Sequence, residues 1–466
     1  MTAPTYAGRV LPTLNEDGSR RWIRPHWSRG PWSRARLVVG YALMGFFLTL
    51  PHLRWNAKPW VLLDLPRREF TFFGTTFLPT DTLLLMLLGL SVLTGIFLIT
   101  ALWGRAWCGW GCPQTIYMEF VFRPIERLIE GGERGSRRMD AEKGKFHAKR
   151  WLKHLIFLVI AAILAHTFLA YFVGTDALAV WIWQSPFEHP TPFLVMAVTT
   201  LLILADFGYF REQVCLVACP YGRWQSALLD KQSLIVAYDY NRGEPRGHGK
   251  DRAGLGDCVD CNACVVTCPT GIDIRQGLQM ECIHCTQCMD ACDTIMQKVN
   301  KPRGLIRYSS QAALAGQPPR LLRPRTVLYP LAFVLFSGTF VWQVQNKAPA
   351  DVTLLGPLGA PYRVEQDGRI TNQVRVRIAN RTRGERAYTY QVLEGFSLGA
   401  TVIAPVNPLV VPPGEMGTAS FFIQLPAESY ARGVVTVTVR VTELSGFSLD
   451  VPFRLTGPGA GLGGGS

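Results

Sequence analysis

Eight of the twelve cysteines of this 466-residue chain lie between residues 258 and 292, and their spacing constrains the fold more than any other feature. Two runs of the form C-x2-C-x2-C-x3-C follow each other, namely Cys258, Cys261, Cys264 and Cys268, and then Cys282, Cys285, Cys288 and Cys292. Gaps of two residues let three thiols gather on one face of a compact loop. Structural zinc sites usually use two C-x2-C pairs set well apart, and neither zinc nor disulfides explain a duplicated triplet with a fourth cysteine.

The two runs resemble those of bacterial ferredoxins with two [4Fe–4S] clusters, in which the fourth cysteine of each run binds the other run's cluster. The resemblance implies a first cysteine set that holds one cluster, made of Cys258, Cys261, Cys264 and Cys292. It implies a second cysteine set for the other cluster, made of Cys268, Cys282, Cys285 and Cys288. The second run ends in Cys292-Asp293 instead of Cys-Pro, which leaves the ligands in place. Two clusters in one domain indicate a path for electrons.

Much of the remaining chain is apolar, with 48% hydrophobic residues and a mean hydropathy of +0.14. Five nearly uncharged runs predict membrane-spanning helices at 37–53, 83–103, 152–173, 193–210 and 326–344. The first run is short, and it could be tilted or interfacial. The 36 polar and basic residues before it predict an uncleaved anchor, because no small-residue cleavage site follows the run.

The distribution of Lys and Arg predicts the orientation of these helices, because cytoplasmic loops carry an excess of both. Residues 1–36 contain seven, residues 104–153 eleven and residues 211–325 fifteen, whereas residues 174–192 contain none. We therefore expect a cytoplasmic N-terminus, a cytoplasmic cysteine-rich segment and an external C-terminus. The net charge of +14 follows from this bias. No basic patch with interleaved aromatic residues indicates nucleic-acid binding.

Beyond residue 345 the pattern changes to alternating apolar and polar residues. Three stretches predict half-buried strands, namely NQVRVRIAN (372–380), TASFFIQL (418–425) and GVVTVTVRVTEL (433–444). Residues typical of turns lie between them. About 110 residues with strands at this spacing suggest an immunoglobulin-like β-sandwich. It has no cysteine, so its stability must come from its core.

The predicted fold is a multi-domain membrane protein with about five transmembrane α-helices, an inserted ferredoxin-like domain and a C-terminal β-sandwich. Its predicted parts are a basic segment 1–36, a four-helix membrane domain 37–219 with a cytoplasmic loop 104–151, the ferredoxin-like domain 220–325, the fifth helix 326–344, the sandwich 345–458 and a flexible tail 459–466.

The other four cysteines form two C-x3-C-P motifs. WCGWGCPQ contains Cys108 and Cys112 after the second span, and VCLVACPYG contains Cys215 and Cys219 after the fourth. Two cysteines four apart on a helical turn face the same way, and the proline that follows cannot extend the helix. Four thiolates could serve one centre, which would be a soft metal ion such as Cu(I), a third cluster or a redox dithiol. The alternative is that they are ordinary buried membrane cysteines.

The twin C-x3-C-P motifs, the run GDCVDCNACVVTCPTGIDIR, the stretch NKPRGLIRYSS and the terminal sandwich together resemble the CcoG/FixG/RdxA family of cytochrome c oxidase accessory proteins. The resemblance covers roughly residues 20–460. It implies a protein of the bacterial cytoplasmic membrane that assists maturation of a haem–copper oxidase, with its sandwich in the periplasm. It also implies cupric reductase activity, in which the clusters pass electrons to copper held near Cys108, Cys112, Cys215 and Cys219. The partners implied are oxidase subunits or copper-delivery proteins, an unidentified electron donor and membrane lipid, with a homodimer as one possible assembly.

Copper chemistry agrees with these residue types, because Cu(I) is soft and favours thiolates, whereas Cu(II) prefers nitrogen and harder ligands. His284 lies inside the second run, where we expect it to tune a cluster and not to bind copper. His52, His154 and His166 fall in or beside spans; two of them could bind haem in a quinol-oxidising protein, although we favour polar side chains capped locally. Asp206 is a functional candidate because it lies in a span, but it is near the interface.

Two rival interpretations remain open. The chain could be an electron-transfer subunit of the quinol-dehydrogenase type for a periplasmic reductase, but such subunits usually end soon after the clusters. It could also be a non-catalytic assembly scaffold whose clusters are only structural.

Overall fold

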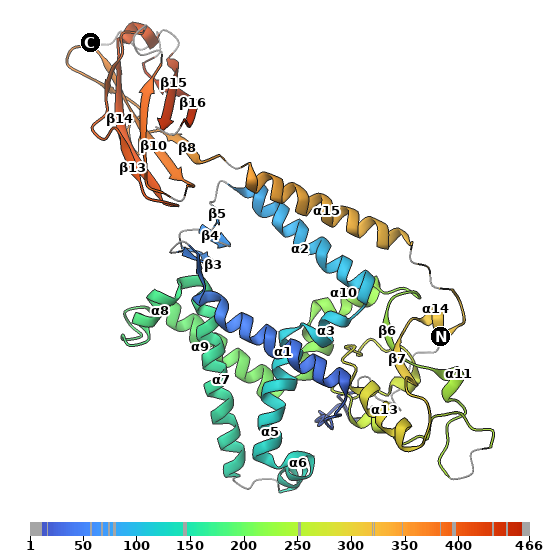
Figure 1. Ribbon diagram of the computed structural model, residues 1–466. Helices are drawn as coiled ribbons and strands as arrows, with labels where there is room; N and C mark the ends of the chain where they lie inside the picture. The colour runs from blue at the N-terminus through green and yellow to red at the C-terminus, as the bar shows by residue number, and fades with distance from the viewer. Residues whose placement is uncertain are drawn as a thin grey trace. The chain divides into compact units, whose positions relative to one another are not determined.

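The computed structural model describes residues 12–458 except 16, 56–57, 67–68, 73–74, 78–80, 143–146, 250–252, 319, 321, 347, 383, 394–397, 431–432 and 444–445. The chain forms two compact units, Met1–Val341 and Trp342–Ser466 (Figure 1). The predicted tail 459–466 lies outside the described residues.

Five helices among the described residues are long and apolar enough to cross a membrane. They are α1 (Pro31–Thr49) with its 3-10 extension η1 (Leu50–His52), α2 (Thr82–Trp103), α7 (Ala148–Val173), α9 (Pro190–Ala205) with the π-helical turn η3 (Asp206–Phe210), and α15 (Pro324–Gln345). The five predicted spans are therefore confirmed. Helix α15 has no buried residue, and its apolar surface suits contact with lipid.

The first span is longer than the sequence suggested. Helix α1 begins at Pro31, and with η1 it covers 22 residues. Proline is favoured in the first turn of a helix because that turn needs no N–H from it. The boundary predicted at residue 36 therefore falls inside the helix, and the run is long enough to span.

The connections between the spans carry structure that the sequence did not predict. Between α1 and α2 lie an antiparallel sheet of β3 (Val61–Asp64), β4 (Glu69–Phe72) and β5 (Thr75–Phe77) and a short pair of β1 (Arg54–Trp55) with β2 (Lys58–Pro59). The loop after α2 folds into α3 (Ala106–Trp110), α4 (Pro113–Tyr117), the π-helix η2 (Met118–Phe122), α5 (Arg123–Glu130) and α6 (Gly132–Ala141). A short helix α8 (Thr175–Trp181) lies between α7 and α9.

After α9 the chain forms the π-helical turn η4 (Val214–Ala218) and α10 (Pro220–Leu228), and then the cysteine-rich segment. Strand β6 (Ile235–Tyr238) pairs antiparallel with β7 (Ile306–Ser309), so the two ends of this segment meet. Between them lie α11 (Tyr240–Gly243), α12 (Ala263–Val266), η5 (Ile274–Gln276) and α13 (Gln287–Lys298), and α14 (Gln311–Leu314) follows β7. Val236, Ile274 and Met296 belong to a core that also contains several of the cysteines.

The second unit is a sandwich of two antiparallel sheets, which confirms the predicted immunoglobulin-like fold. One sheet has the order β12-β14-β10-β8, with β9 beside β10, and the other β13-β11-β15-β16. The strands are β8 (Ala350–Leu355), β9 (Arg363–Val364), β10 (Ile370–Asn380), β11 (Arg386–Val392), β12 (Thr401–Ile403), β13 (Leu409–Val411), β14 (Met416–Leu425), β15 (Val434–Glu443) and β16 (Ser448–Thr456), and the 3-10 turn η6 (Ala427–Tyr430) precedes β15. Alternate residues of β10, β14 and β15 fill the core, as the period of two predicts.

Candidate electron-transfer and metal site

The two cysteine runs have the same unusual backbone. Asp260 and Asn262 have φ values of 51° and 57°, and His284 and Thr286, at the same places in the second run, have 53° and 60°. Each pair is followed at once by a helix, α12 or α13. Left-handed residues turn the chain tightly, and they are uncommon outside glycine. The repeat shows how each C-x2-C-x2-C run folds back so that its thiols can converge.

The fourth cysteine of each run has thiols of the other run among its neighbours. Burial, and then the neighbouring Cys264, Cys258 and Cys261, raise the pKa of Cys292 to about 12. Burial also raises the pKa of Cys288, and the thiols of Cys285, Cys282 and Cys268 act in the same direction. Each fourth cysteine therefore lies beside the other run. The binding of a cluster by each set stays a prediction.

The surroundings of the second cysteine set fit an anionic cluster. Arg36 is 1% exposed, and within the described part of the chain its two terminal nitrogens have no hydrogen-bond partner. Burial raises the pKa of Cys285 to about 12, and the positive charge of Arg36 opposes that rise. A buried, unpaired cation is costly unless an anion accompanies it. A cluster held by four thiolates would be that anion, and it would supply one-electron redox chemistry.

The two C-x3-C-P motifs also repeat each other. Gly104 and Arg211, each four residues before the first cysteine, have φ values of 57° and 55°. The backbone N–H of Cys112 donates to the carbonyl of Trp107 at 2.9 Å, and that of Cys219 donates to Val214 at 2.8 Å. Each motif thus ends in the same wide turn, with a hydrogen bond that reaches back five residues.

This geometry corrects one prediction from the sequence. Helix α3 ends at Trp110 and η4 ends at Ala218, so neither pair of cysteines shares one regular helical turn. The proline after each motif starts a new helix, α4 or α10, because its fixed φ suits the first helical position.

The two motifs bring their cysteines together as a four-thiol site (Cys108, Cys112, Cys215 and Cys219). Burial, and then the nearby thiol of Cys112, raise the pKa of Cys108 to about 12, and Cys219 adds to the rise. Burial raises the pKa of Cys215 too, followed by Cys112, Cys108 and Cys219. Among the described residues, no three His, Cys, Asp or Glu side chains are arranged to hold a single metal ion.

Two polar side chains lie beside the four-thiol site. Gln225 was not identified from the sequence, and Asp206 was named there only as a functional candidate. The thiol of Cys108 donates to Oε1 of the fully buried Gln225 at 3.3 Å, and Gln225 donates to the carbonyl of Gly104 at 3.2 Å. No sequence signal marks this glutamine. Asp206 accepts a hydrogen bond from Nε2 of Gln114 at 2.7 Å, and it lies near Cys112 and Cys215.

The first C-x3-C-P motif packs directly on the second cysteine run. The backbone N–H of Arg105 donates to Nδ1 of His284 at 3.2 Å, and its guanidinium donates to the carbonyl of Cys282 at 3.3 Å. A Cβ atom at Gly109 would lie 2.6 Å from the carbonyl oxygen of Ile283 and 2.9 Å from Cα of Cys285. Burial, and then the charge of Arg105, lower the pKa of His284 to about 3, so this imidazole is neutral.

Known proteins share this chain's domains and most of its length. Family models match at residues 85–130 (4Fe-4S binding domain), 210–311 (4Fe-4S dicluster domain) and 340–458 (the IG-like fold at the C-terminus of FixG). RdxA of Cereibacter sphaeroides is 33% identical over 408 residues, which cover 84% of each chain. The chain belongs to the FixG/RdxA family.

Two further relatives are similar to this chain. The nitrogen fixation protein FixG of Rhizobium meliloti is 30% identical over 500 residues, covering 96% of this chain and 94% of FixG. YccM of Escherichia coli, whose name suggests a role in electron transport, is 25% identical over 263 residues, covering 54% of this chain and 66% of YccM. The predicted family is confirmed, and this FixG/RdxA family member is an iron–sulfur electron-transfer protein with 4Fe-4S binding domains.

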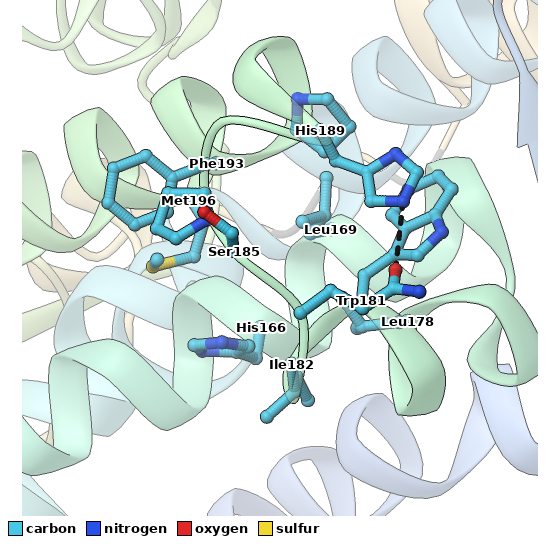
Figure 2. Close-up of a pocket in the computed structure, with 12 residues that line it drawn as sticks. His166, Leu169, Leu178, Trp181, Ile182, Ser185, His189, Phe193 and Met196 are labelled. Atoms are coloured by element: carbon cyan, nitrogen blue, oxygen red, sulfur yellow. Dashed lines mark hydrogen bonds between the residues drawn. The ribbon is translucent and has the colours of Figure 1, made fainter.

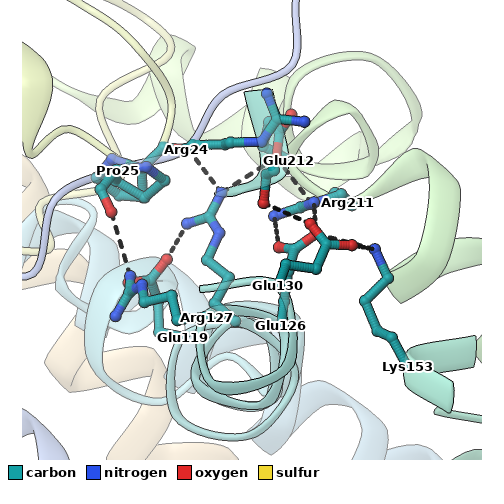
Figure 3. A network of polar contacts seen from close by, with 12 residues as sticks. Arg24, Pro25, Glu119, Glu126, Arg127, Glu130, Lys153, Arg211 and Glu212 are labelled. Atoms are coloured by element: carbon teal, nitrogen blue, oxygen red, sulfur yellow. Dashed lines mark hydrogen bonds and ion pairs between the residues drawn. The ribbon is translucent and has the colours of Figure 1, made fainter. Parts of the chain in front are cut away.

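This family member also contains a buried charge network that sequence reasoning missed, made of Glu119, Arg123, Glu126, Glu130, Lys153, Arg211 and Glu212 (Figure 3). Arg123 pairs with Glu119 and, at 3.1 Å, with Glu212, and it donates to the carbonyl of Pro269 at 3.2 Å. Pro269 follows Cys268, so the network contacts the second cysteine set. Charges of both signs in RPIERLIE, residues 123–130, were the available signal.

The histidines in or beside the spans lie in different surroundings. Nδ1 of His166 bonds to the carbonyl of Ala162 at 2.7 Å, one turn earlier in α7. His166 lines a cavity of about 150 Å³ with His189, which stacks on Trp181 at 4.3 Å between ring centroids (Figure 2). His154 lies on α7 as well, and His52 is an exposed residue that ends η1.

Proposed function

We propose that the chain assists maturation of a haem–copper cytochrome c oxidase by reducing Cu(II) to Cu(I) at the four-thiol site. The observation that carries this proposal is the place of that site. Its four cysteines lie outside both ferredoxin-type sets, they converge from two distant motifs, and the first motif packs on the second cysteine run through Arg105 and His284.

The donor chemistry supports copper as the substrate. Cu(I) favours thiolates, so a cluster of cysteines stabilises the reduced ion. Burial raises the pKa values of Cys108 and Cys215, which keeps these thiols protonated until a cation arrives. Copper binding then displaces protons from them. Each Cu(II) would take up one electron, which the clusters of the iron–sulfur domain would supply, and would leave as Cu(I).

The residues around the thiols position them for this task. Gln225 holds the thiol of Cys108 and the carbonyl of Gly104, so it fixes the motif relative to the end of α2. Arg105 and the close approach at Gly109 hold the motif against the second cysteine run. Together these contacts hold the first motif and its thiols directly against the second cysteine run.

The proposed setting is the bacterial cytoplasmic membrane, with the N-terminus and the cysteine-rich segment in the cytoplasm and the sandwich in the periplasm. The excess of Lys and Arg in residues 104–153 and 211–325 supports this orientation. Oxidase subunits or copper-delivery proteins would be the partners on the product side.

A third iron–sulfur centre at the same four thiols is the second candidate. The match to a 4Fe-4S binding domain covers residues 85–130, which contain only Cys108 and Cys112 among the cysteines. A centre there would need two more thiolates, and Cys215 and Cys219 are the ones at hand.

Anaerobic reduction of copper by the full-length protein tests the proposal. The protein is reduced with dithionite, freed of excess reductant and mixed with Cu(II) and a Cu(I)-specific chelator. We expect about two Cu(I) per chain from two one-electron clusters. Unreduced protein is the control for copper reduction by thiols alone. Intact clusters without copper reduction would favour a non-catalytic assembly scaffold. An iron content of about twelve per chain, in place of about eight, would favour a third iron–sulfur centre at the four thiols.

A further inference from the structure

We propose that a cavity at the inner end of α7 and α9 binds an uncharged, lipid-soluble quinol, which supplies the electrons for the proposed copper reduction. This interface cavity has a volume of about 650 Å³. Ligand pockets typically have about 300–1,000 Å³, so a small-molecule headgroup fits. The proposal names the electron source and so rests on the proposed function.

The lining of the interface cavity is amphipathic. Leu201, Leu204 and Ala205 contribute an apolar wall from α9, within a membrane span. Trp22 and Tyr209 add aromatic rings, which meet edge to face at 6.1 Å. Charged side chains line the rest. A ligand that suits both parts has a hydrocarbon tail and a planar polar headgroup, as quinols have.

The charges around the cavity favour an uncharged ligand over an anionic lipid headgroup. Arg24 pairs with Asp140 at 2.5 Å, and Arg150 pairs with the same carboxylate. Lys153 pairs with Glu130 at 2.5 Å and with Glu126 at 3.3 Å. Each of these three cations thus has a carboxylate partner, although Glu130 does not line the cavity and Glu126 also pairs with Arg211. An anionic headgroup would have to compete with these carboxylates for the cations.

A hydrogen-bonding group remains for an oxygen of a quinol. The imidazole of His154 lines the cavity, and its ring makes no hydrogen bond to another described residue. It is the group available to accept a hydroxyl proton.

Gly208 keeps room beside His154. It lies in the π-helical turn η3, a type of turn frequent at functional sites. A Cβ atom at Gly208 would lie 4.0 Å from the imidazole, so a larger side chain would enter the cavity.

The charge network joins the interface cavity to the second cysteine set. Glu126 lines the cavity and pairs with Arg211 at 3.0 Å. Arg211 is next to Glu212 (Figure 3). Glu212 pairs with Arg123, which donates to the carbonyl of Pro269 beside Cys268. Oxidation of one quinol to quinone releases two electrons and two protons. The two electrons would pass to the iron–sulfur centres that the two cysteine sets would hold, His154 would take one proton, and the other proton would pass to water at the cavity mouth.

The test uses the full-length protein in detergent with a short-tailed benzoquinone, and it follows tryptophan fluorescence quenching. We expect saturable binding that Gly208→Phe weakens at least tenfold. Ala205→Phe is a second filling variant in case Gly208→Phe loses iron. Gly89→Phe on α2 is the matched control, because a Cβ there has no atom within 4 Å, and it should bind as wild type does. The corresponding quinol, added anaerobically, should bleach the visible absorbance of the wild-type clusters.

The proposal is overturned if binding does not saturate, if both filling variants bind like Gly89→Phe, or if the quinol leaves the clusters oxidised. It is also overturned if phosphatidylglycerol vesicles displace the quinone, because the cavity would then be a lipid headgroup site. Dithionite-reduced wild-type protein separates the two proposals. Copper reduction by that protein without cluster reduction by quinol contradicts only the quinol site, whereas failure of the dithionite-reduced protein contradicts the proposed function.

Discussion

The backbone N–H of Arg105 donates to Nδ1 of His284 at 3.2 Å, and this bond between residues 179 positions apart joins two cysteine motifs. Arg105 precedes Cys108, and His284 lies between Cys282 and Cys285. Because His284 accepts through Nδ1, its proton is on Nε2, which is buried and has no partner among the described residues. Nε2–H of His284 is therefore a hydrogen-bond donor inside the iron–sulfur domain. Nδ1, through its bond to Arg105, holds the four-thiol site beside that domain.

Gly109→Ala tests whether this close packing matters. The new methyl group would meet the backbone at Ile283 and Cys285 at 2.6–2.9 Å, and backbone cannot move aside cheaply. We expect a loss of about 1–3 kcal/mol in stability from overpacking, with slower copper reduction. Gly45→Ala on α1 is the control, because a Cβ there has no atom within 4 Å and alanine favours a helix. Equal thermal unfolding of both variants would show that the motif is not packed as described.

Cys261→Ser tests the assignment of the first cysteine set. Cys261 is exposed, so serine should disturb the fold little while removing one thiolate ligand. We expect iron to fall from about eight to about four per chain, and the spin coupling between two reduced clusters to disappear from the EPR spectrum. Metal and acid-labile sulfide analysis checks the count. Stoichiometric zinc with no iron in the wild-type protein would refute the ferredoxin interpretation.

Reporter fusions test the orientation. A reporter after residue 345 should be active outside the cytoplasm, and one within residues 225–320 should be active inside it. We expect this because residues 211–325 contain fifteen Lys and Arg, whereas residues 174–192 contain none, and such an excess marks the cytoplasmic side. An internal C-terminus would require one of the five helices not to span.

The acid stability of the protein should depend on Glu126. Burial alone would raise the pKa of this carboxyl, but Arg211 and Lys153 outweigh it and lower the pKa to about 2. A lowered pKa stabilises the fold above the ordinary value of 4.5, and that stability is lost as the pH falls towards 2. A shift of this size corresponds to about 3 kcal/mol.

Glu126→Gln removes the titrating group, so its stability should change less than that of wild type between pH 4.5 and 3. Far-UV circular dichroism during thermal unfolding measures the difference. Glu188→Gln, at an exposed position in the connection between α8 and α9, is the control for loss of one carboxylate. Parallel pH profiles for wild type and Glu126→Gln would contradict the role given to the charge network.

The sequence predicts the elements of this fold better than their junctions. Cysteine spacing and apolar runs depend on local periodicity, so the runs at 258–292, the five spans and the sandwich could all be recognised. The start of α1 was missed because Arg34 and Arg36 interrupt its apolar pattern, although Pro31 begins the helix. Arg36 is nevertheless almost fully buried, with Nε bonded to the carbonyl of Gly109 at 2.9 Å.

The contacts that build the candidate site depend on tertiary structure. No sequence pattern pairs Gln225 with Cys108 or Arg105 with His284, and only the fold brings each pair together. The wide turn at Cys112 and Cys219 was mistaken for a helical turn because a spacing of four residues is compatible with both. The π-helical turns are likewise hidden, since one extra residue in a turn leaves no mark on composition.

Replacement of the four-thiol cysteines by serine tests the central claim most directly. Cys108→Ser, Cys112→Ser, Cys215→Ser, Cys219→Ser and the quadruple variant are compared for copper reduction after dithionite and for iron content. Serine is a hard, essentially un-ionised ligand that cannot hold Cu(I) as a thiolate does. Because residues that act as a unit are strongly non-additive, each single variant should be about as impaired as the quadruple variant, with about eight irons retained. Cys261→Ser should show the opposite signature, with lost iron. Full copper reduction by the quadruple variant would contradict the account.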